Sequence, residues 1–115
     1  MYSPGSDYAH SLEVRSERLL FVSGTMGLDA DGVAPPTLDA QLELVWDNLR
    51  AILAGAGMTL DNVVRVTSYL RDAAYAEANA AARVAALGRA VPTTAIVVET
   101  LDPSWLVEVE VIAAA

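Results

Sequence analysis

The sequence predicts an α+β fold in which two helices pack on one face of a sheet, with the element order β-β-α-β-α-β-β. Three observations predict it. Short apolar, β-branched runs bounded by Gly, Pro or Asp are typical of buried strands. Two longer segments carry apolar residues three and four positions apart, as amphipathic helices do. Helices that follow strands favour crossover connections. With 115 residues, we expect one domain spanning 1–115.

The first part of the chain predicts a hairpin. Residues 1–7 are polar and turn-forming, so we expect a loosely ordered lead-in there. Residues 17–25 are an apolar run closed by Ser-Gly, which is typical of a buried strand. The stretch 8–15 alternates more weakly and is a candidate to pair with that strand. Residues 27–36 have the composition of a loop.

The remaining elements follow from capping and periodicity. Thr37 comes after two prolines and is the expected N-cap of an amphipathic helix that ends at Gly55-Ala56-Gly57. Residues 62–70 are β-branched and aromatic, which predicts a strand. Asp72 is the expected cap of an alanine-rich helix over 73–87, which Gly88 ends. Two strands are expected at 93–100 and 106–113.

Composition excludes several kinds of chemistry. The chain has no cysteine and a single histidine, His10, so disulfides, thiolate nucleophiles and zinc-cysteine sites are excluded, and we expect no metal and no cofactor. All seven basic residues are arginines, which excludes a Schiff-base lysine. The net charge of −8 disfavours nucleic-acid binding. No run is long and apolar enough to span a membrane and no signal-peptide pattern is seen, so we expect a cytoplasmic protein without a membrane partner.

The last predicted strand carries a pair of carboxylates. In the segment 107–111, alternation with a period of two puts Glu108 and Glu110 on one face and three valines on the other. From spacing alone, a sheet with one solvated face explains the two glutamates better than catalysis does.

Five segments together resemble the RidA/YjgF family, the reactive-intermediate deaminases also labelled L-PSP endoribonucleases. They are residues 19–25 (LLFVSGT), 48–57 (NLRAILAGAG), 61–72 (DNVVRVTSYLRD), 78–79 (AN) and 106–113 (LVEVEVIA). They occur in the family's order over nearly the whole chain. The resemblance implies a chorismate-mutase-like domain that assembles as a barrel-like homotrimer. It also implies small-molecule clefts between subunits, in which imine or enamine intermediates are hydrolysed.

The resemblance also implies roles for individual residues. Glu108 matches the family's catalytic glutamate, whereas Glu110 keeps a structural interpretation. The positions that match ligand-binding residues of the family are Tyr8, Ser23, Gly24, Thr25 and Asn79. Each of these also has an ordinary structural explanation, such as a rim aromatic, a strand terminus or a satisfied amide.

One position departs from the family. Where family deaminases have Pro-Ala-Arg-Ser, with an arginine that binds the substrate carboxylate, this chain has the segment 92–95 (PTTA), so Thr94 replaces that arginine. If Thr94 faces the cleft, Ile96 does too, because strand side chains alternate. A hydroxyl binds a carboxylate more weakly than a guanidinium does, so we expect an altered substrate. Arg15, Arg18 and Arg89 are candidate replacements, although solvated surface charges explain them better.

The sequence therefore leaves two functions open. The first is hydrolysis of an imine or enamine that lacks the usual carboxylate, with Glu108 activating water. The second is non-catalytic binding of a small metabolite in the same cleft. The acidic charge argues against a ribonuclease.

Overall fold

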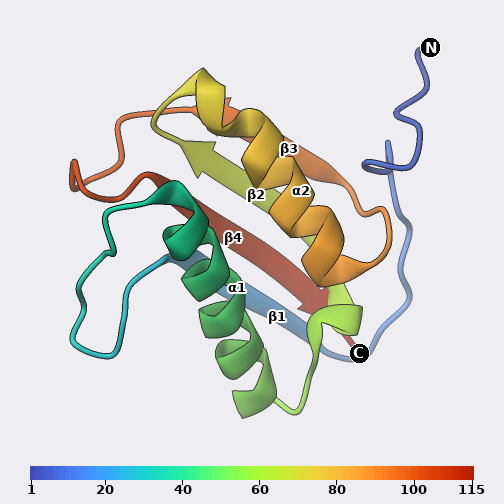
Figure 1. The fold of residues 1–115 in the computed structure, drawn as a ribbon. Coiled ribbons are helices and arrows are strands. Elements are labelled where there is room, and N and C mark those ends of the chain that lie inside the picture. The colour runs from blue at the N-terminus through green and yellow to red at the C-terminus, as the bar shows by residue number, and fades with distance from the viewer.

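The computed structural model describes all 115 residues and has the predicted α+β fold (Figure 1). Its sheet has four strands in the order β1-β4-β2-β3. The strands are β1 (Leu19–Met26), β2 (Val63–Leu70), β3 (Thr93–Val97) and β4 (Val107–Ala114). β4 is antiparallel to β1 and β2, whereas β2 and β3 are parallel. Helices α1 (Leu38–Gly55) and α2 (Ala76–Leu87) both lie on one face of this sheet, and the other face is uncovered.

The expected first strand of the hairpin does not form. Within residues 8–15 only Ala9 makes a bridge, to Pro92, and its N–H donates to the carbonyl of Val91 at 3.1 Å. Residues 10–15 are exposed, so Leu12 and Val14 are not buried against the sheet and nothing fixes a register. The outer edge of β1 is therefore an edge of the sheet. The expectation of two strands before the first helix was wrong, and one strand precedes it.

The predicted capping residues act as caps. The Thr37 side chain accepts a hydrogen bond from the N–H of Ala40 at the start of α1. The Asp72 carboxylate accepts one from Ala74, but it caps a 3₁₀ turn, η2 (Ala73–Tyr75), that leads into α2. α2 ends at Gly88, whose φ of 68° is a left-handed conformation that suits glycine.

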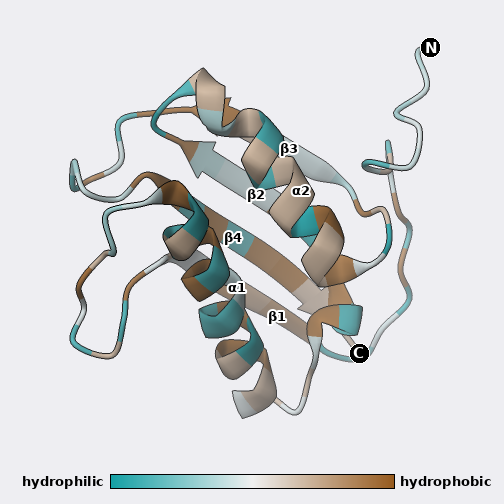
Figure 2. Ribbon diagram, in the orientation of Figure 1, coloured by the Kyte–Doolittle hydropathy of each residue, from teal (hydrophilic) through white to brown (hydrophobic).

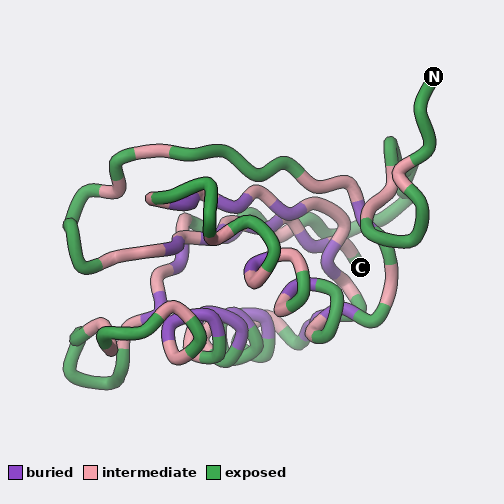
Figure 3. Tube along the Cα trace, turned by 45° about the horizontal axis from the view of Figure 1, so that its top comes forward, coloured by how far each residue is buried: buried purple, intermediate pink, exposed green.

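The core lies between the two helices and the covered face of the sheet. Alternation on β4 turns Val107, Val109 and Val111 toward the helices, where they are buried. From α1, Val45, Leu49 and Leu53 are fully buried against them, whereas Ile52, one residue from Leu53, is exposed. Figure 2 shows the apolar stretches of the strands under the helices, and Figure 3 shows the buried residues concentrated on the strands and on the inner side of α1.

The last two strands are close to their expected positions. β3 ends at Val97, three residues before the expected end, and β4 runs one residue further than expected. None of the helices is both long enough and apolar enough to cross a membrane.

Candidate functional site

The uncovered face of the sheet carries a group of polar side chains from three neighbouring strands. We call it the open-face cluster; it consists of Arg65, Tyr69, Thr94, Glu108 and Glu110. The strand register brings these residues together, because Tyr69 of β2 lies opposite Glu108 and Thr67 lies opposite both Glu110 and Thr94. The two glutamates alternate with the buried valines of β4, as the period of two predicts. The candidate site therefore lies on the face that the helices leave free.

Tyr69 links the strands within this cluster. Its hydroxyl donates a hydrogen bond to Oε1 of Glu110. This hydrogen bond raises the pKa of the Tyr69 phenol above its ordinary value, and burial and the negative charges of Glu110 and Glu108 raise it further. Glu110, for which the sequence indicated a structural role, is thus held by a tyrosine on the neighbouring strand.

Glu108 lies against a glycine of the neighbouring strand. A Cβ built on Gly24 would be 2.1 Å from Oε2 of Glu108, so only glycine leaves room for this carboxylate. Gly24 belongs to a β-bulge, since the register of β1 shifts between Val22 and Thr25. The bulge keeps both Val22 and Thr25 on the buried side. Glu108 also lines a crevice of about 230 Å³ next to residues 98–101.

A guanidinium that the sequence analysis missed lies at Thr94. Nη2 of Arg65, on β2, donates to the hydroxyl of Thr94 at 2.8 Å. Arg65 lies two positions before Thr67, the residue opposite Thr94, and therefore projects on the same face. Arg65 could have been identified as a neighbour of Thr94 only from the parallel pairing of β2 with β3. The guanidinium beside Thr94 therefore comes from β2, and not from Arg15, Arg18 or Arg89.

The three arginines considered as replacements lie elsewhere. The Arg18 guanidinium donates to the carbonyl of Ala56 at 2.6 Å. Arg89 donates to three carbonyls around the turn before β2, those of Leu60, Asp61 and Val63. Arg15 is exposed in the segment before β1. None of the three contributes to the open-face cluster.

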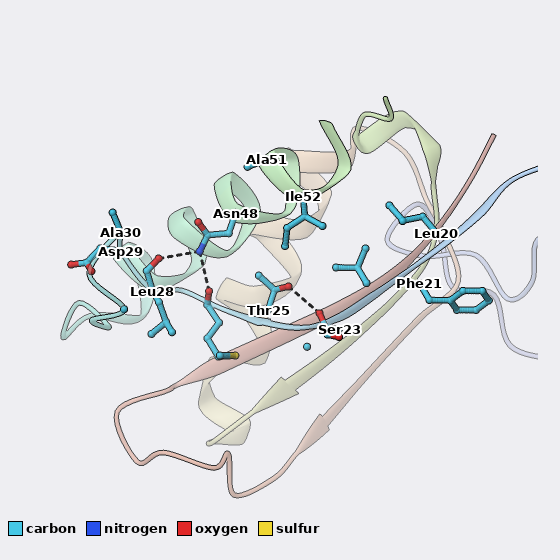
Figure 4. A pocket seen from close by; sticks show the side chains of 14 residues that line it. Leu20, Phe21, Ser23, Thr25, Leu28, Asp29, Ala30, Asn48, Ala51 and Ile52 are labelled. Carbon is cyan, nitrogen blue, oxygen red and sulfur yellow. Dashed lines mark hydrogen bonds between the residues drawn. The ribbon is translucent and has the colours of Figure 1, made fainter. Parts of the chain in front are cut away.

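Residues Ser23, Gly24 and Thr25 border the largest groove of the structure (Figure 4). It has a volume of about 760 Å³ and lies between β1, the loop after it and α1. Thr25 is buried and its hydroxyl donates to the carbonyl of Ser23 at 3.0 Å. Asn48 of α1 holds the loop by donating to the carbonyls of Met26 and Leu28. The groove lies on the helix side of β1, whereas Gly24 faces Glu108.

Tyr8 and Asn79 lie in a different pocket, of about 320 Å³, between α2, β3 and the N-terminal segment. Thr93 and Ala95 line this pocket, so Thr94 and Ile96 point to the opposite face of β3. Ile96 lies beside Tyr69 on the open face. Within one subunit, the residues that the resemblance assigned to one cleft therefore form separate groups. Glu108, Gly24, Thr94 and Ile96 share the open face, and Tyr8 and Asn79 lie behind β3.

The side chains available do not suit a metal ion. No group of three His, Asp or Glu side chains is close enough to hold one. The chemistry of the open-face cluster is that of carboxylates, a phenol and a guanidinium, which transfer protons and bind anions.

These features define a small α+β protein whose uncovered sheet face carries carboxylates beside an arginine. The chain belongs to the family described as Endoribonuclease L-PSP, whose sequence model matches residues 2–115, and this is the RidA/YjgF family that the sequence resembles.

Individual relatives agree with this assignment. The RutC family protein YjgH of Escherichia coli is 43% identical over 67 residues, which cover 58% of this chain and 51% of YjgH. The aligned segment thus spans about half the length of the curated relatives it matches. Among solved structures, the Rid-family protein YyfB of Yersinia pestis is similar with a TM-score of 0.84 and 29% identity, over 95% of this chain and 87% of YyfB. RidA of an Antarctic Psychrobacter has a TM-score of 0.80 and 26% identity, over 98% and 92% of the two chains.

Proposed function

We propose that this protein hydrolyses imine or enamine intermediates in small-molecule clefts between the subunits of a homotrimer. Glu108 would be the catalytic residue. Membership of the RidA/YjgF family supports the proposal, and so does the resemblance of segment 106–113 to the strand that carries the family's catalytic glutamate. The observation that carries it is the carboxylate of Glu108 on the open face, with Gly24 leaving it room and Tyr69 opposite it.

The chemistry needs one general base and one water. Glu108 takes a proton from the water, whose oxygen attacks the carbon of the C=N bond. Glu108 returns this proton to the nitrogen, which gives a carbinolamine. A second proton then passes from the carbinolamine hydroxyl to the nitrogen through Glu108, as the C–N bond breaks and the C=O bond forms. An imine and one water thus give a carbonyl compound and ammonia, with no redox partner.

Two observations support an assembly of several subunits. The open face is apolar at the end opposite Glu108, where Phe21, 71% exposed, pairs with Ile112 of β4. Such a surface favours burial against another copy of the chain. The residues that the resemblance assigns to one cleft also lie on both sides of β3 within a subunit. A cleft between subunits would allow both groups to contribute to one site.

Arg65 decides which substrate charge the proposed site would favour. Its only hydrogen bond in the subunit is the one to Thr94, and no carboxylate lies within ion-pair distance of it. The other N–H groups of its guanidinium are therefore free to bind an anion. This arrangement favours a carboxylated imine over the neutral imine that Thr94 alone indicates.

The test measures ammonia release from freshly generated carboxylated and neutral imines. We expect Glu108→Ala to lower kcat by about 100-fold or more, in the range usual for a general base. Arg65→Gln should raise KM for the carboxylated imine more than for the neutral one. Glu43→Ala, which removes an exposed carboxylate of α1, is the matched control. Full activity of Glu108→Ala would overturn the proposal.

The alternative is a non-catalytic protein that binds a small metabolite in the same cleft. One observation favours it: Tyr69 donates to Glu110, and Glu108 has no hydrogen-bond partner within the subunit to orient it as a base. In that case neither wild type nor any variant releases ammonia from an imine. A bound ligand would still change the NMR signals of the residues in the open-face cluster. A ribonuclease is not proposed, because a net charge of −8 opposes binding of a phosphate backbone.

A further inference from the structure

We propose that Arg71 is a positioning residue that holds one wall of the crevice at Glu108 and thereby limits the size of the substrate group that the site admits. Arg71 would act in the hydrolysis described above, so this role rests on the proposed function. The wall consists of residues 98–101, which line the crevice together with Tyr69 and Glu108. The crevice has a volume of about 230 Å³, below the roughly 300–1,000 Å³ of most small-molecule pockets, so a small shift of the wall changes what fits.

The wall belongs to the loop between β3 and β4, whose two ends are fixed by backbone hydrogen bonds. At its start, the N–H of Val98 donates to the carbonyl of Leu70 at 2.8 Å. At its end, the carbonyl of Leu106 accepts from the N–H of Arg71 at 3.1 Å. Between these ends, residues 99–103 make no backbone hydrogen bond to the sheet, so their position depends on side chains.

The guanidinium of Arg71 supplies the side-chain contacts to the middle of this loop. Its Nη1 lies within hydrogen-bonding distance of three acceptors, which are the carbonyl of Thr100 at 3.3 Å, the hydroxyl of Thr100 at 3.0 Å and the carbonyl of Asp102 at 3.2 Å. No carboxylate lies within ion-pair distance of Arg71. The contacts of this guanidinium are therefore all with the loop, and a charged donor makes such bonds stronger than a neutral one would.

The hydroxyl of Thr100 passes this constraint along the loop. It accepts from Arg71 and donates to the carbonyl of Trp105 at 2.6 Å. The carboxylate of Asp102 closes the turn by accepting from the N–H of Ser104 at 2.8 Å and from its hydroxyl at 2.6 Å. Loss of the Arg71 guanidinium therefore frees the middle of the loop, while both of its ends stay bonded to the sheet.

The experiment compares ammonia release from two freshly generated carboxylated imines, one with a methyl and one with a butyl side chain. We expect wild type to favour the methyl imine. Arg71→Gln should lower the ratio of the two kcat/KM values by about ten-fold, because a wider crevice admits the longer chain. Thr100→Val, which removes the hydroxyl at nearly constant shape, should lower the ratio too, and Thr100→Ser should keep it. Arg15→Gln, which removes an exposed arginine before β1, is the matched control.

Amide hydrogen exchange followed by NMR gives a second measurement, which needs no substrate. In Arg71→Gln the N–H of Trp105, bonded to the carbonyl of Asp102 at 3.0 Å, should exchange about ten-fold faster, whereas that of Val98 should keep its rate. If Arg71→Gln does not fold, Thr100→Val carries both measurements.

The outcomes separate this role of Arg71 from the proposed function. Equal exchange of the Trp105 N–H in wild type and variant would overturn the role, as would an unchanged ratio of kcat/KM values in an active variant. Absence of ammonia from wild type would overturn the proposed function instead, and hydrogen exchange would still decide whether Arg71 holds the wall.

Discussion

At the scale of single residues, the position of Glu108 depends on a neighbour without a side chain. Its carboxylate occupies the space that a Cβ of Gly24 would fill, and the contact is with the flexible end of the glutamate. A methyl group at this position therefore displaces the carboxylate rather than the backbone. Gly24 thus affects where the Glu108 carboxylate lies far more than it affects the stability of the sheet.

Gly24→Ala tests this separation of position from stability. We expect a fall in kcat of about 100-fold, since a catalytic group moved by about 1 Å has effects of that size. The free energy of unfolding should change by no more than about 1 kcal/mol. Gly55→Ala is the control, because a Cβ there meets nothing within 4 Å. Urea denaturation and ammonia release on both variants make the measurement, and unimpaired kcat in Gly24→Ala would contradict the role of Gly24.

The hydrogen bond from Tyr69 to Glu110 predicts a pH dependence. The bond raises the pKa of the phenol in the folded protein above the ordinary value of about 10, so the folded state holds this proton more tightly than the unfolded state does. Its contribution to stability is therefore complete below pH 10 and is lost as the pH rises through the folded pKa.

Two measurements test whether the pKa of Tyr69 is raised. In an ultraviolet titration, wild type minus Tyr69→Phe should show a phenol that ionises later than free tyrosine, and Glu110→Gln should bring its pKa closer to the ordinary value. Thermal melts should show a difference between wild type and Tyr69→Phe that is constant near neutral pH and shrinks in strong alkali. A Tyr69 that ionises at or below the ordinary pKa would contradict the prediction.

The cluster also shows how much of a site a sequence can predict. Alternation along β4 placed Glu108 and Glu110 on one face, because period-two geometry is a local property of a strand. Arg65 could not be assigned in the same way. Its proximity to Thr94 depends on which strands are neighbours and in which register, and residues 29 positions apart in sequence meet only through that pairing.

At the scale of elements, a buried glutamine connects α1 to two loops, the one before α1 and the one before β4. Gln41 is 1% exposed. Its Nε2 donates to the carbonyls of Pro35 and Ser104, both at 2.8 Å, and its Oε1 accepts from the N–H of Leu106 at 2.9 Å. The side chain therefore fixes the loop before α1 and the start of β4 together. Since Leu106 lies directly before that strand, Gln41 also helps to place Glu108.

Gln41→Ala is expected to destabilise the fold by about 3 kcal/mol, because three partly buried hydrogen bonds to the backbone are lost. Glu43→Ala, an exposed change two positions away on the same helix, should stay within about 0.5 kcal/mol of wild type. Urea denaturation of both variants measures the difference. Equal midpoints for the two would show that the loops do not depend on Gln41.

The helices, whose caps can be identified from neighbouring residues, were predicted well. The strand expected at 8–15, which needs a partner strand to form, was not. Thr37 and Asp72 act as caps because their side chains bond to backbone groups two or three residues away. The stretch 8–15 has a weak alternation, and its residues 10–15 remain exposed because no neighbouring strand covers them. Its composition contains no signal for the one contact that it makes with the sheet, the bridge from Ala9 to Pro92 just before β3.

At the scale of the whole molecule, the uncovered sheet face has two chemically different ends. Glu108 and Tyr69 lie toward one end, and the exposed Phe21 and the half-buried Ile112 that it pairs with lie toward the other. Helices cover the opposite face, so the apolar end can be buried only by another molecule. A second copy of the chain that packs there would cover Phe21 and leave the carboxylates at the margin of the contact, where a cleft could form.

Phe21→Glu should therefore dissociate the proposed trimer while leaving each chain folded. The side chain is 71% exposed within the subunit, so a charge there costs the isolated fold little, whereas burial of that charge against another copy costs several kcal/mol. Light scattering should show a trimer for wild type and a monomer for Phe21→Glu. Val33→Glu, at a residue 57% exposed in the loop between β1 and α1, should stay trimeric. If Phe21→Glu keeps the mass of wild type, the open face is not the contact surface, and the cleft must lie elsewhere. If it becomes monomeric and also loses ammonia release while circular dichroism stays unchanged, the active cleft needs more than one subunit.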